Sequence, residues 1–264
     1  MLLVERGLAP SRTLAQALVM EGRVRAAGRR VDKPGTRVDV DSDVTVAGDP
    51  RRFASRGGLK LEAALDAFAL DVAGLVALDV GASTGGFTDC LLKRGAARVY
   101  AVDVGHGQID QALRADPRVK VLEKINARFL EAGHLPGPVD LVVMDVSFIS
   151  ATMILPALPP LMRGVDAVVL VKPQFEVGRA GVSKGGIVRS PEGWRAAIAG
   201  VAEGARAAGF RARNVIASPI TGAEGNREFL LHLALARDGA IPSPEAIAPA
   251  IDAAVAAPVD GETP

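Results

Sequence analysis

The sequence predicts a protein of the α/β fold class, in which a small α+β domain precedes a larger domain built on a doubly wound sheet. Three observations carry this prediction. The length of 264 residues is typical of about two domains. From residue 75 onward, short apolar runs alternate with helical segments, as in a parallel sheet covered by helices on both faces. Residues 1–60 hold twelve basic and seven acidic side chains, whereas the remainder holds 19 and 23.

The composition excludes several classes of protein. The single cysteine, Cys90, cannot build a disulfide framework or a zinc finger, and it falls in a predicted helix as a small core residue. No stretch approaches the ~20 apolar residues of a membrane span, and charged residues interrupt the apolar start of the chain. His106, His134 and His232 show no metal-ligand spacing. We therefore expect a soluble, cytoplasmic protein that binds neither a membrane nor a metal ion.

Residues 1–50 predict the small domain. Two short helices are expected first, the second over Arg12–Met20 with Ser11 as its N-cap. Val24–Val31 predicts a tight hairpin, and Val38–Val46 has the alternation of a strand. Basic side chains cluster at the second helix and the hairpin, where they suit RNA phosphates or, as the alternative, a solvated face. They are Arg12, Arg23, Arg25, Arg29 and Arg30.

The segment from residue 1 to about residue 47 resembles the S4 RNA-binding domain. The resemblance rests on G-L-A-x-S-R, a helix, E-G-x-V, a G-x-x-V turn and K-P-G. The sequence departs from the family at its start, where the family has several more residues, often basic, before the position of Leu2. Residues 51–58 are predicted to form a linker. Its glycines and bases, Arg56 among them, suit a hinge that touches RNA, and a plain polar connector is the alternative.

A glycine-rich turn is the strongest local signal in the larger domain, 59–240. The apolar run Leu75–Val80 predicts a buried strand, Gly81–Gly86 the turn, and Phe87–Lys93 a helix. Asp103 ends the next predicted strand 22 residues after Gly81, where a carboxylate that binds ribose is expected. The turn is neither G-x-G-x-x-G nor a phosphate-binding loop with a lysine, so a dinucleotide is the weaker interpretation.

The D-x-G-x-x-x-G-G turn resembles the first motif of S-adenosylmethionine (SAM) methyltransferases, which implies SAM as the cofactor. Asn126, after the third strand, is expected near its adenine, and His106 near its pocket. The expected cofactor-binding residues are Asp79, Gly81, Ser83, Thr84, Gly85, Gly86, Phe87, Asp103, Asn126 and Asp145.

Further strands and one long helix follow at the spacing of a Rossmann-like doubly wound sheet. The strands are predicted at Val119–Leu122, Val139–Met144, Ala167–Val171, Arg211–Ala217 and Phe229–Ala234, and the helix at Pro191–Ala208. Ligands of such sheets bind at the carboxyl ends of strands. Asp145 and Lys172 lie at such ends, Lys60 in a helix before the first strand, and Glu228 before the last strand. Each residue alone also fits a solvated charge, a helix cap or a salt bridge.

Together these four residues resemble the FtsJ-like 2′-O-ribose methyltransferases, and residues 1–240 resemble the TlyA family. The shared motifs are S-R-G-G-x-K-L, D-V-G-A-S-T-G-G-F-T-D, A-V-D-V-G, M-D-V-S-F-I-S, V-K-P-Q-F-E-V-G and P-I-T-G-A-E-G-N-R-E-F-L. The family is described as rRNA methyltransferases, with cytidine as the target, and often carries the label hemolysin. The resemblance implies that the chain acts on ribosomal subunits and that Lys60, Asp145, Lys172 and Glu228 form the catalytic tetrad.

The chemistry of methyl transfer to a ribose hydroxyl suits these residue types. We expect Lys172 to be the general base or to orient the hydroxyl, and Lys60 to be a second cation near the ribose or phosphate. Asp145 and Glu228 would orient the two amines. A glycine-rich loop that contains Arg179 and Lys184, followed by Arg189, suits a lid over RNA or a plain surface loop.

Two alternative functions remain at the level of sequence, and one segment lies outside the resemblance. A non-catalytic RNA-binding or ribosome-assembly protein could use the same fold, although the intact tetrad favours an enzyme. A membrane-active hemolysin would match the family label, but no strongly amphipathic apolar segment supports it. Residues 241–264, rich in Ala and Pro, are predicted to form a disordered or loosely helical tail.

Overall fold

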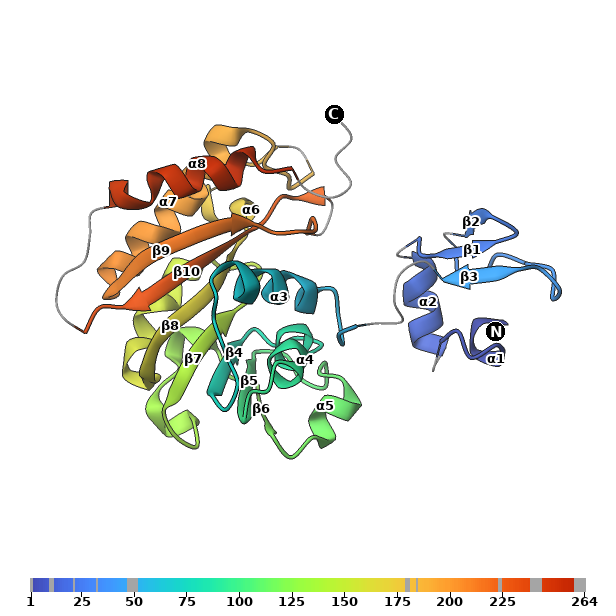
Figure 1. Cartoon of the computed structure of the whole chain (residues 1–264), viewed down its shortest axis with the longest axis horizontal. Helices are drawn as coiled ribbons and strands as arrows, with labels where there is room; N and C mark the ends of the chain where they lie inside the picture. Colours follow the sequence, from blue (N-terminus) through green and yellow to red (C-terminus); the bar gives the residue numbers. More distant parts are fainter. Residues whose placement is uncertain are drawn as a thin grey trace. The chain divides into compact units, whose positions relative to one another are not determined.

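The computed structural model describes residues 2–9, 12–20, 22–31, 33–46, 52–178, 181–183, 185–222, 225–237 and 244–258. The chain divides into two compact units, residues 1–52 and 53–264, and each is described here by itself (Figure 1). The α/β class with a small α+β unit at the amino terminus, predicted from the sequence, is confirmed.

The first unit packs two helices, α1 (Leu2–Glu5) and α2 (Arg12–Met20), against a three-stranded antiparallel sheet in the order β2-β1-β3. Its strands are β1 (Val24–Ala26), β2 (Arg29–Val31) and β3 (Val44–Val46). The predicted hairpin is present because Ala27 and Gly28 both adopt positive φ, which turns β1 back onto β2. Ser11, the predicted N-cap, lies outside the described residues.

The strand predicted over Val38–Val46 forms only at its last three residues. The Arg6 guanidinium donates to the carbonyl oxygens of Val40 and Ser42, the latter at 2.6 Å. These carbonyls therefore bond to a side chain instead of a neighbouring strand, and the segment before β3 stays irregular.

The second unit is built on a seven-stranded sheet in the order β6-β5-β4-β7-β8-β10-β9. The strands are β4 (Val76–Val80), β5 (Arg98–Asp103), β6 (Val119–Glu123), β7 (Val139–Met144), β8 (Met162–Val171), β9 (Phe210–Ala217) and β10 (Phe229–Leu235). The five strands from β6 to β8 pair in parallel, and β10 is inserted antiparallel between β8 and β9. The strand order reverses between β4 and β7, which is where doubly wound sheets bind their ligands.

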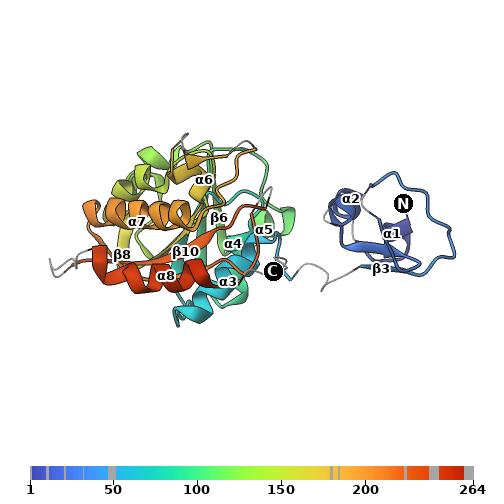
Figure 2. The same ribbon diagram turned by 90° about the horizontal axis from the view of Figure 1, so that it is seen from above.

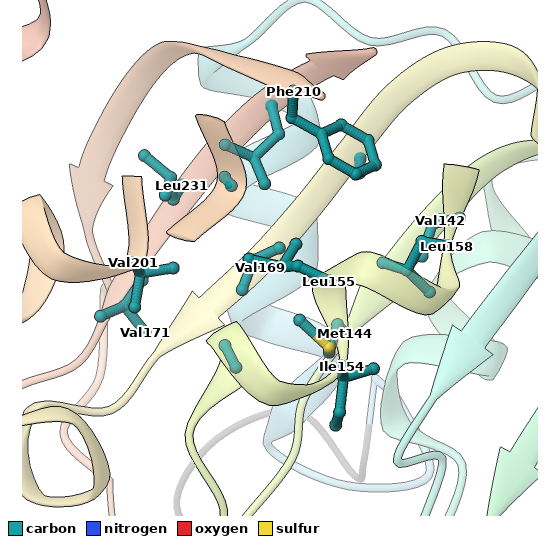
Figure 3. Packing of buried hydrophobic residues seen from close by; sticks show 14 of the residues in the cluster. Val142, Met144, Ile154, Leu155, Leu158, Val169, Val171, Val201, Phe210 and Leu231 are labelled. Carbon is teal, nitrogen blue, oxygen red and sulfur yellow. The ribbon is translucent and has the colours of Figure 1, made fainter. Parts of the chain in front are cut away.

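Helices cover both faces of this sheet. The face with α3 (Gly57–Ala67), α4 (Gly86–Lys93) and α5 (Gln111–Ala115) buries one set of strand residues. The other face packs against α7 (Pro191–Ala207) and five short 3₁₀ turns, at 127–129, 132–134, 151–153, 155–157 and 159–161. Within β7, Leu141 and Val143 face α3 and α4. Val142 and Met144 belong to the hydrophobic cluster on the opposite face of the sheet, which packs against α7 and is drawn in Figure 3. This two-sided burial explains why the strands read as apolar runs.

Of the two alternatives predicted for residues 241–264, a disordered or a loosely helical tail, the disordered one is wrong for residues 244–258, and the helix found there is packed on the core. A 3₁₀ turn (Pro244–Ile247) leads into α8 (Ala248–Ala256), which runs beside α7 in Figures 1 and 2. Ile247, Ile251 and Val255 are buried with the core of the second face. They recur at four-residue spacing, so the helix has an apolar side that the Ala and Pro content concealed.

The predicted linker, 51–58, is also too long. Phe53 is buried in the core of the second unit, and Ala54 N donates to Asp89 Oδ2 of α4 at 2.7 Å. Gly57 and Gly58 already belong to α3, so residues 53–58 are a fixed part of the second unit and not a hinge. Among the helices that the structure describes, none is long and apolar enough to cross a membrane.

Candidate active site

The glycine turn after β4 is held by its neighbours on both sides. Gly81 N and Ala82 N donate to Val102 O of β5, at 2.9 and 3.1 Å. Gly81 has a φ of +84°, and a Cβ there would lie 2.3 Å from Asp145 O. The turn therefore sits against the carboxyl ends of both β5 and β7, at the point where the strand order reverses.

The next two glycines are required by packing within the protein. A Cβ on Gly85 would lie 2.3 Å from Leu113 Cδ1, and one on Gly86 would lie 2.2 Å from Ser55 Oγ and 3.0 Å from Gly58 N. Ser83 and Thr84 are exposed at the tip of the turn, while the Phe87 side chain is buried in the core. Of the expected cofactor residues in this segment, Phe87 can thus present only its backbone to a ligand.

Asp79, the last but one residue of β4, is a buried carboxyl group. Thr88 Oγ1 of α4 donates to its Oδ2 at 2.6 Å, and its Oδ1 has no hydrogen-bond partner in the described part of the chain. Burial raises the pKa of Asp79 to about 7, opposed by the Thr88 bond and supported by the charges of Asp145 and Asp103. Three carboxyl groups thus lie near one another beside the turn.

Asp103 ends β5 and accepts two backbone hydrogen bonds, from Ser83 N at 2.8 Å and Gly105 N at 2.7 Å. These bonds fix the carboxylate between the glycine turn and the next loop. In the adjacent strand Glu123 accepts from Gly107 N at 2.8 Å and lies 2.7 Å from His106 Nδ1.

Asn126 caps a short 3₁₀ turn, where its Oδ1 accepts from Arg128 N at 3.1 Å. Its side chain is exposed and follows β6, so it lies at the carboxyl edge of the sheet, as the sequence predicted for a residue near the cofactor.

Lys172 and Asp145 form one ion pair at the carboxyl ends of β8 and β7. Lys172 Nζ lies 2.6 Å from Asp145 Oδ1 and donates to Ser147 Oγ at 2.8 Å. The lysine stem is largely buried, so the amine is held in one direction by a carboxylate and a hydroxyl. Sequence reasoning missed Ser147, although it stands in the M-D-V-S-F-I-S motif.

Lys60 and Glu228 form a second, buried ion pair between α3 and the start of β10. Because β10 runs antiparallel to β8, with Phe229 opposite Val171, Glu228 and Lys172 lie at the same edge of the sheet. The structure thus brings the four residues of the expected tetrad to one edge, arranged as two lysine–carboxylate pairs.

An exposed aromatic side chain stands next to these pairs. Phe148 is 92% exposed, has a φ of +64°, and its ring centroid lies 5.3 Å from that of Phe175. A positive φ is unusual for a bulky residue, so the loop after Asp145 holds this ring toward solvent at a cost in backbone energy. Sequence reasoning did not single out either ring.

The expected RNA-binding arginines of the first unit are mostly exposed. Arg25 and Arg30 lie opposite each other on β1 and β2, on the solvent face of the sheet, with Arg12 and Arg29 also exposed and Arg23 half-buried. The Arg25 guanidinium donates to Gly28 O at 3.1 Å, and the Arg30 guanidinium lies against Gly22. Arg56 and Arg189 of the second unit are exposed, whereas Arg179 and Lys184 lie outside the described residues.

Comparison with known proteins identifies the family. Residues 53–235 match the family model of FtsJ-like methyltransferases, and residues 1–44 match that of the S4 domain. The 16S/23S rRNA (cytidine-2′-O)-methyltransferase TlyA of Mycobacterium tuberculosis is 49% identical over 241 residues, 90% of each chain. The chain belongs to the TlyA family.

Other members of the TlyA family carry a different label. Hemolysin A of Brachyspira hyodysenteriae is 40% identical over 228 residues, 86% of this chain and 95% of its own. A solved structure described as a hemolysin, from Streptococcus thermophilus, has a TM-score of 0.77 and 41% identity, over 96% of this chain and 93% of its own. A SAM-dependent methyltransferase from Listeria monocytogenes shares the fold, with a TM-score of 0.50 at 14% identity, over 69% of this chain and 99% of its own.

As a TlyA-family protein with an FtsJ-like domain, the chain is a methyltransferase that uses SAM. The site fits this cofactor: Asp103 bonds to Ser83 N of the glycine turn, Asp145 borders Gly81, and Asp79 lies in the strand that leads into the turn, so the acidic residues around it suit a cationic ligand. Asp79 Oδ1 offers a buried acceptor that no described protein atom uses. Across the described residues, no three His, Cys, Asp or Glu side chains gather as metal ligands.

Proposed function

We propose that this chain transfers the methyl group of SAM to the 2′-hydroxyl of a cytidine in ribosomal RNA, in the cytoplasm. The Mycobacterium tuberculosis relative, similar over nine-tenths of both chains, is described as a cytidine-2′-O-methyltransferase of 16S and 23S rRNA. The observation that carries the proposal is the pair of lysine–carboxylate contacts at the sheet edge that also holds the glycine turn and Asp103.

The two lysines have different roles in this proposal. SAM supplies an electrophilic methyl group on a sulfonium. Lys172 Nζ, fixed by Asp145 and Ser147, holds the ribose hydroxyl in line. It receives the hydroxyl proton only as the neutral amine, after the ammonium has released one proton to solvent. Such alignment is worth roughly 7–11 kcal/mol of a barrier, so positioning contributes more than the strength of the base. Lys60, held by Glu228, provides positive charge for the neighbouring ribose or phosphate.

The RNA is held by surfaces on both units in this proposal. On the first unit, the paired Arg25 and Arg30 suit phosphates. On the second, the exposed ring of Phe148 offers the flat apolar surface on which unpaired bases stack. Further positive charge comes from basic residues in the sequence of the second unit, namely Arg56, Arg179, Lys184 and Arg189.

Transfer of tritium from labelled SAM to each purified ribosomal subunit tests the proposal, followed by mass-spectrometric mapping of methylated riboses. We expect incorporation at a cytidine 2′-oxygen. Lys172→Ala should abolish transfer and leave SAM binding within about twofold, because its amine faces the hydroxyl and not the cofactor turn. RNA binding without any incorporation by the unaltered protein would point to an assembly factor, and leakage of liposomes without incorporation would point to a hemolysin.

A further inference from the structure

The carboxyl-terminal helix α8 lies beyond residues 53–235, the part that matches the family model, yet it is packed into the second unit. Its last turn is joined to the site by one side chain. Arg227 Nη1 donates to Val255 O at 3.2 Å and Nη2 donates to Ala257 O at 2.5 Å. The last carbonyls of a helix have no partner within the helix and carry partial negative charge, so a guanidinium is well placed there.

Arg227 is anchored as firmly on its other side. It is only 6% exposed, and its guanidinium carbon lies 4.6 Å from the ring centroid of Trp194 in α7 and 5.8 Å from that of Phe229. The guanidinium therefore connects α7, α8 and the first residue of β10.

The next residue in the chain is Glu228, which pairs with Lys60 on the opposite face of the sheet. Successive residues of an extended strand point to opposite faces. Phe229 and Leu231 pack with α7 and α8, whereas Leu230 packs with α3 and α4. By the same alternation Arg227 faces α8 and Glu228 faces α3, so the start of β10 is held from both sides at once.

We propose that α8, through Arg227, is a positioning element for the Lys60–Glu228 pair, and that Arg227 is a positioning residue for methyl transfer. This inference rests on the proposed function. Backbone bonds from Ser218 N to Glu228 O and from Gly222 N to Asn226 O also hold this segment. Loss of the Arg227 contacts with Val255 and Ala257 therefore loosens the strand start without releasing it, and the Glu228 carboxylate fixes the Lys60 amine less precisely. Arg227 itself lies on the far face of the sheet from this pair.

The test compares Arg227→Met and Arg227→Lys with a matched control, Arg237→Lys. Arg237 follows the other end of β10 and donates to the carbonyls of residues 162–164, at 2.6–3.2 Å, so it has the same kind of contact away from the site. All assays run well below the Tm of each variant. We expect Arg227→Met to lower kcat by about 10- to 100-fold, with KM for RNA and the Kd of SAM within about twofold. Arg237→Lys should lower Tm but leave kcat unchanged.

A double-mutant cycle with Glu228→Gln separates positioning from general stability. If Arg227 acts through Glu228, Arg227→Met causes no further loss of kcat in the Glu228→Gln background. Equal losses in both backgrounds, or a similar kcat loss in Arg237→Lys, would overturn the proposal. Should Arg227→Met fail to fold, Arg227→Lys, which keeps the charge but not the two-carbonyl geometry, gives the same comparison.

A readout independent of activity is amide hydrogen exchange. We expect faster exchange in Arg227→Met both at the end of α8 and at residues 228–230, and faster exchange confined to α8 would contradict the inference. Failure of the proposed function is recognised separately, because the unaltered protein would then transfer no methyl group at all.

Discussion

At the scale of single residues, the site depends on how each charged group is held. Lys172 is fixed by Asp145 and Ser147, whereas Lys60 is buried against Glu228. The sequence motifs pointed to the four residues of the expected tetrad, but the pairing of these residues could not be predicted from their spacing. It depends on the antiparallel insertion of β10, which brings a residue before the last strand next to the end of β8.

Asp79 gives a residue-scale prediction about pH. Its pKa is raised from 3.8 to about 7 by burial, so the folded protein holds this proton more tightly than the unfolded chain does. The resulting stability is present below about pH 4 and is lost as the pH rises through about 7. Without cofactor, the unaltered protein and Asp79→Asn each have a free energy of unfolding. The first minus the second should therefore fall between about pH 4 and pH 7, by at most about 4 kcal/mol. Urea unfolding at pH 5, 6, 7 and 8 measures it, and a constant difference would refute the raised pKa.

Phe148 gives a second residue-scale prediction. Stacking of a base on an aromatic ring contributes roughly 1–3 kcal/mol, so Phe148→Ala should raise KM for RNA by about 5- to 150-fold. The Kd of SAM should not change. Because the ring is 92% exposed, its removal should not lower the Tm. The Tm should rise if alanine, being smaller, lets the backbone at residue 148 leave its positive φ. An unchanged KM for RNA in steady-state assays would show that Phe148 takes no part in RNA recognition. The control is Met153→Ala, because Met153 is an exposed apolar residue on the 3₁₀ turn that follows.

At the scale of elements, the strands were predicted well because burial on both faces makes them continuous apolar runs. β7 occurs at its predicted bounds, whereas β8 begins five residues earlier than predicted, at Met162. The first half of β8 was missed because it contains exposed and half-buried residues, such as Arg163, and is not a continuous apolar run. The packing of α8 on the core was missed because its buried positions are isolated among Ala and Pro. Phe53 was the available signal that the predicted linker is part of the core.

The contact between α3 and α4 gives an element-scale prediction. Gly86→Ala places a Cβ 3.0 Å from Gly58 N and against Ser55 Oγ, so the two helix starts must separate. We expect a loss of about 1–3 kcal/mol in the free energy of unfolding and a lower kcat, because α3 carries Lys60. Gly200→Ala is the matched control, because Gly200 lies on the exposed side of α7 and an added Cβ would meet no described atom within 4 Å outside its own helix. It should stabilise the protein by up to about 1 kcal/mol. Equal unfolding midpoints for the two variants would disprove the close packing.

At the scale of the whole molecule, the two units divide the work. The first has a small core of its own around Leu3, Leu18 and Val24, and the second holds the cofactor turn and both ion pairs. Substitutions on the solvent face of the first unit should therefore change RNA binding and leave the chemistry of the second unit intact.

Salt dependence tests this division. Arg25→Gln with Arg30→Gln should weaken RNA binding and reduce the slope of log Kd against log salt by about 1–2, because each arginine neutralises about one phosphate. The kcat at saturating RNA and the Kd of SAM should not change. Arg206→Gln, an exposed arginine paired with Glu203, is the control and should leave the slope as it is. A slope that is unaffected by the double substitution would place RNA recognition elsewhere.

The pairing of Lys60 with Glu228 joins residues 168 positions apart, from the first helix and the last strand of the second unit. A product of premature termination would therefore keep the arginines of the first unit, the glycine turn and Asp103, but would lack one member of this pair. Such a chain would also lack β10, which pairs with both β8 and β9, so its second unit could not complete the sheet. We therefore expect nonsense alleles that end before residue 228 to yield no methyl transfer, whatever RNA the first unit still binds.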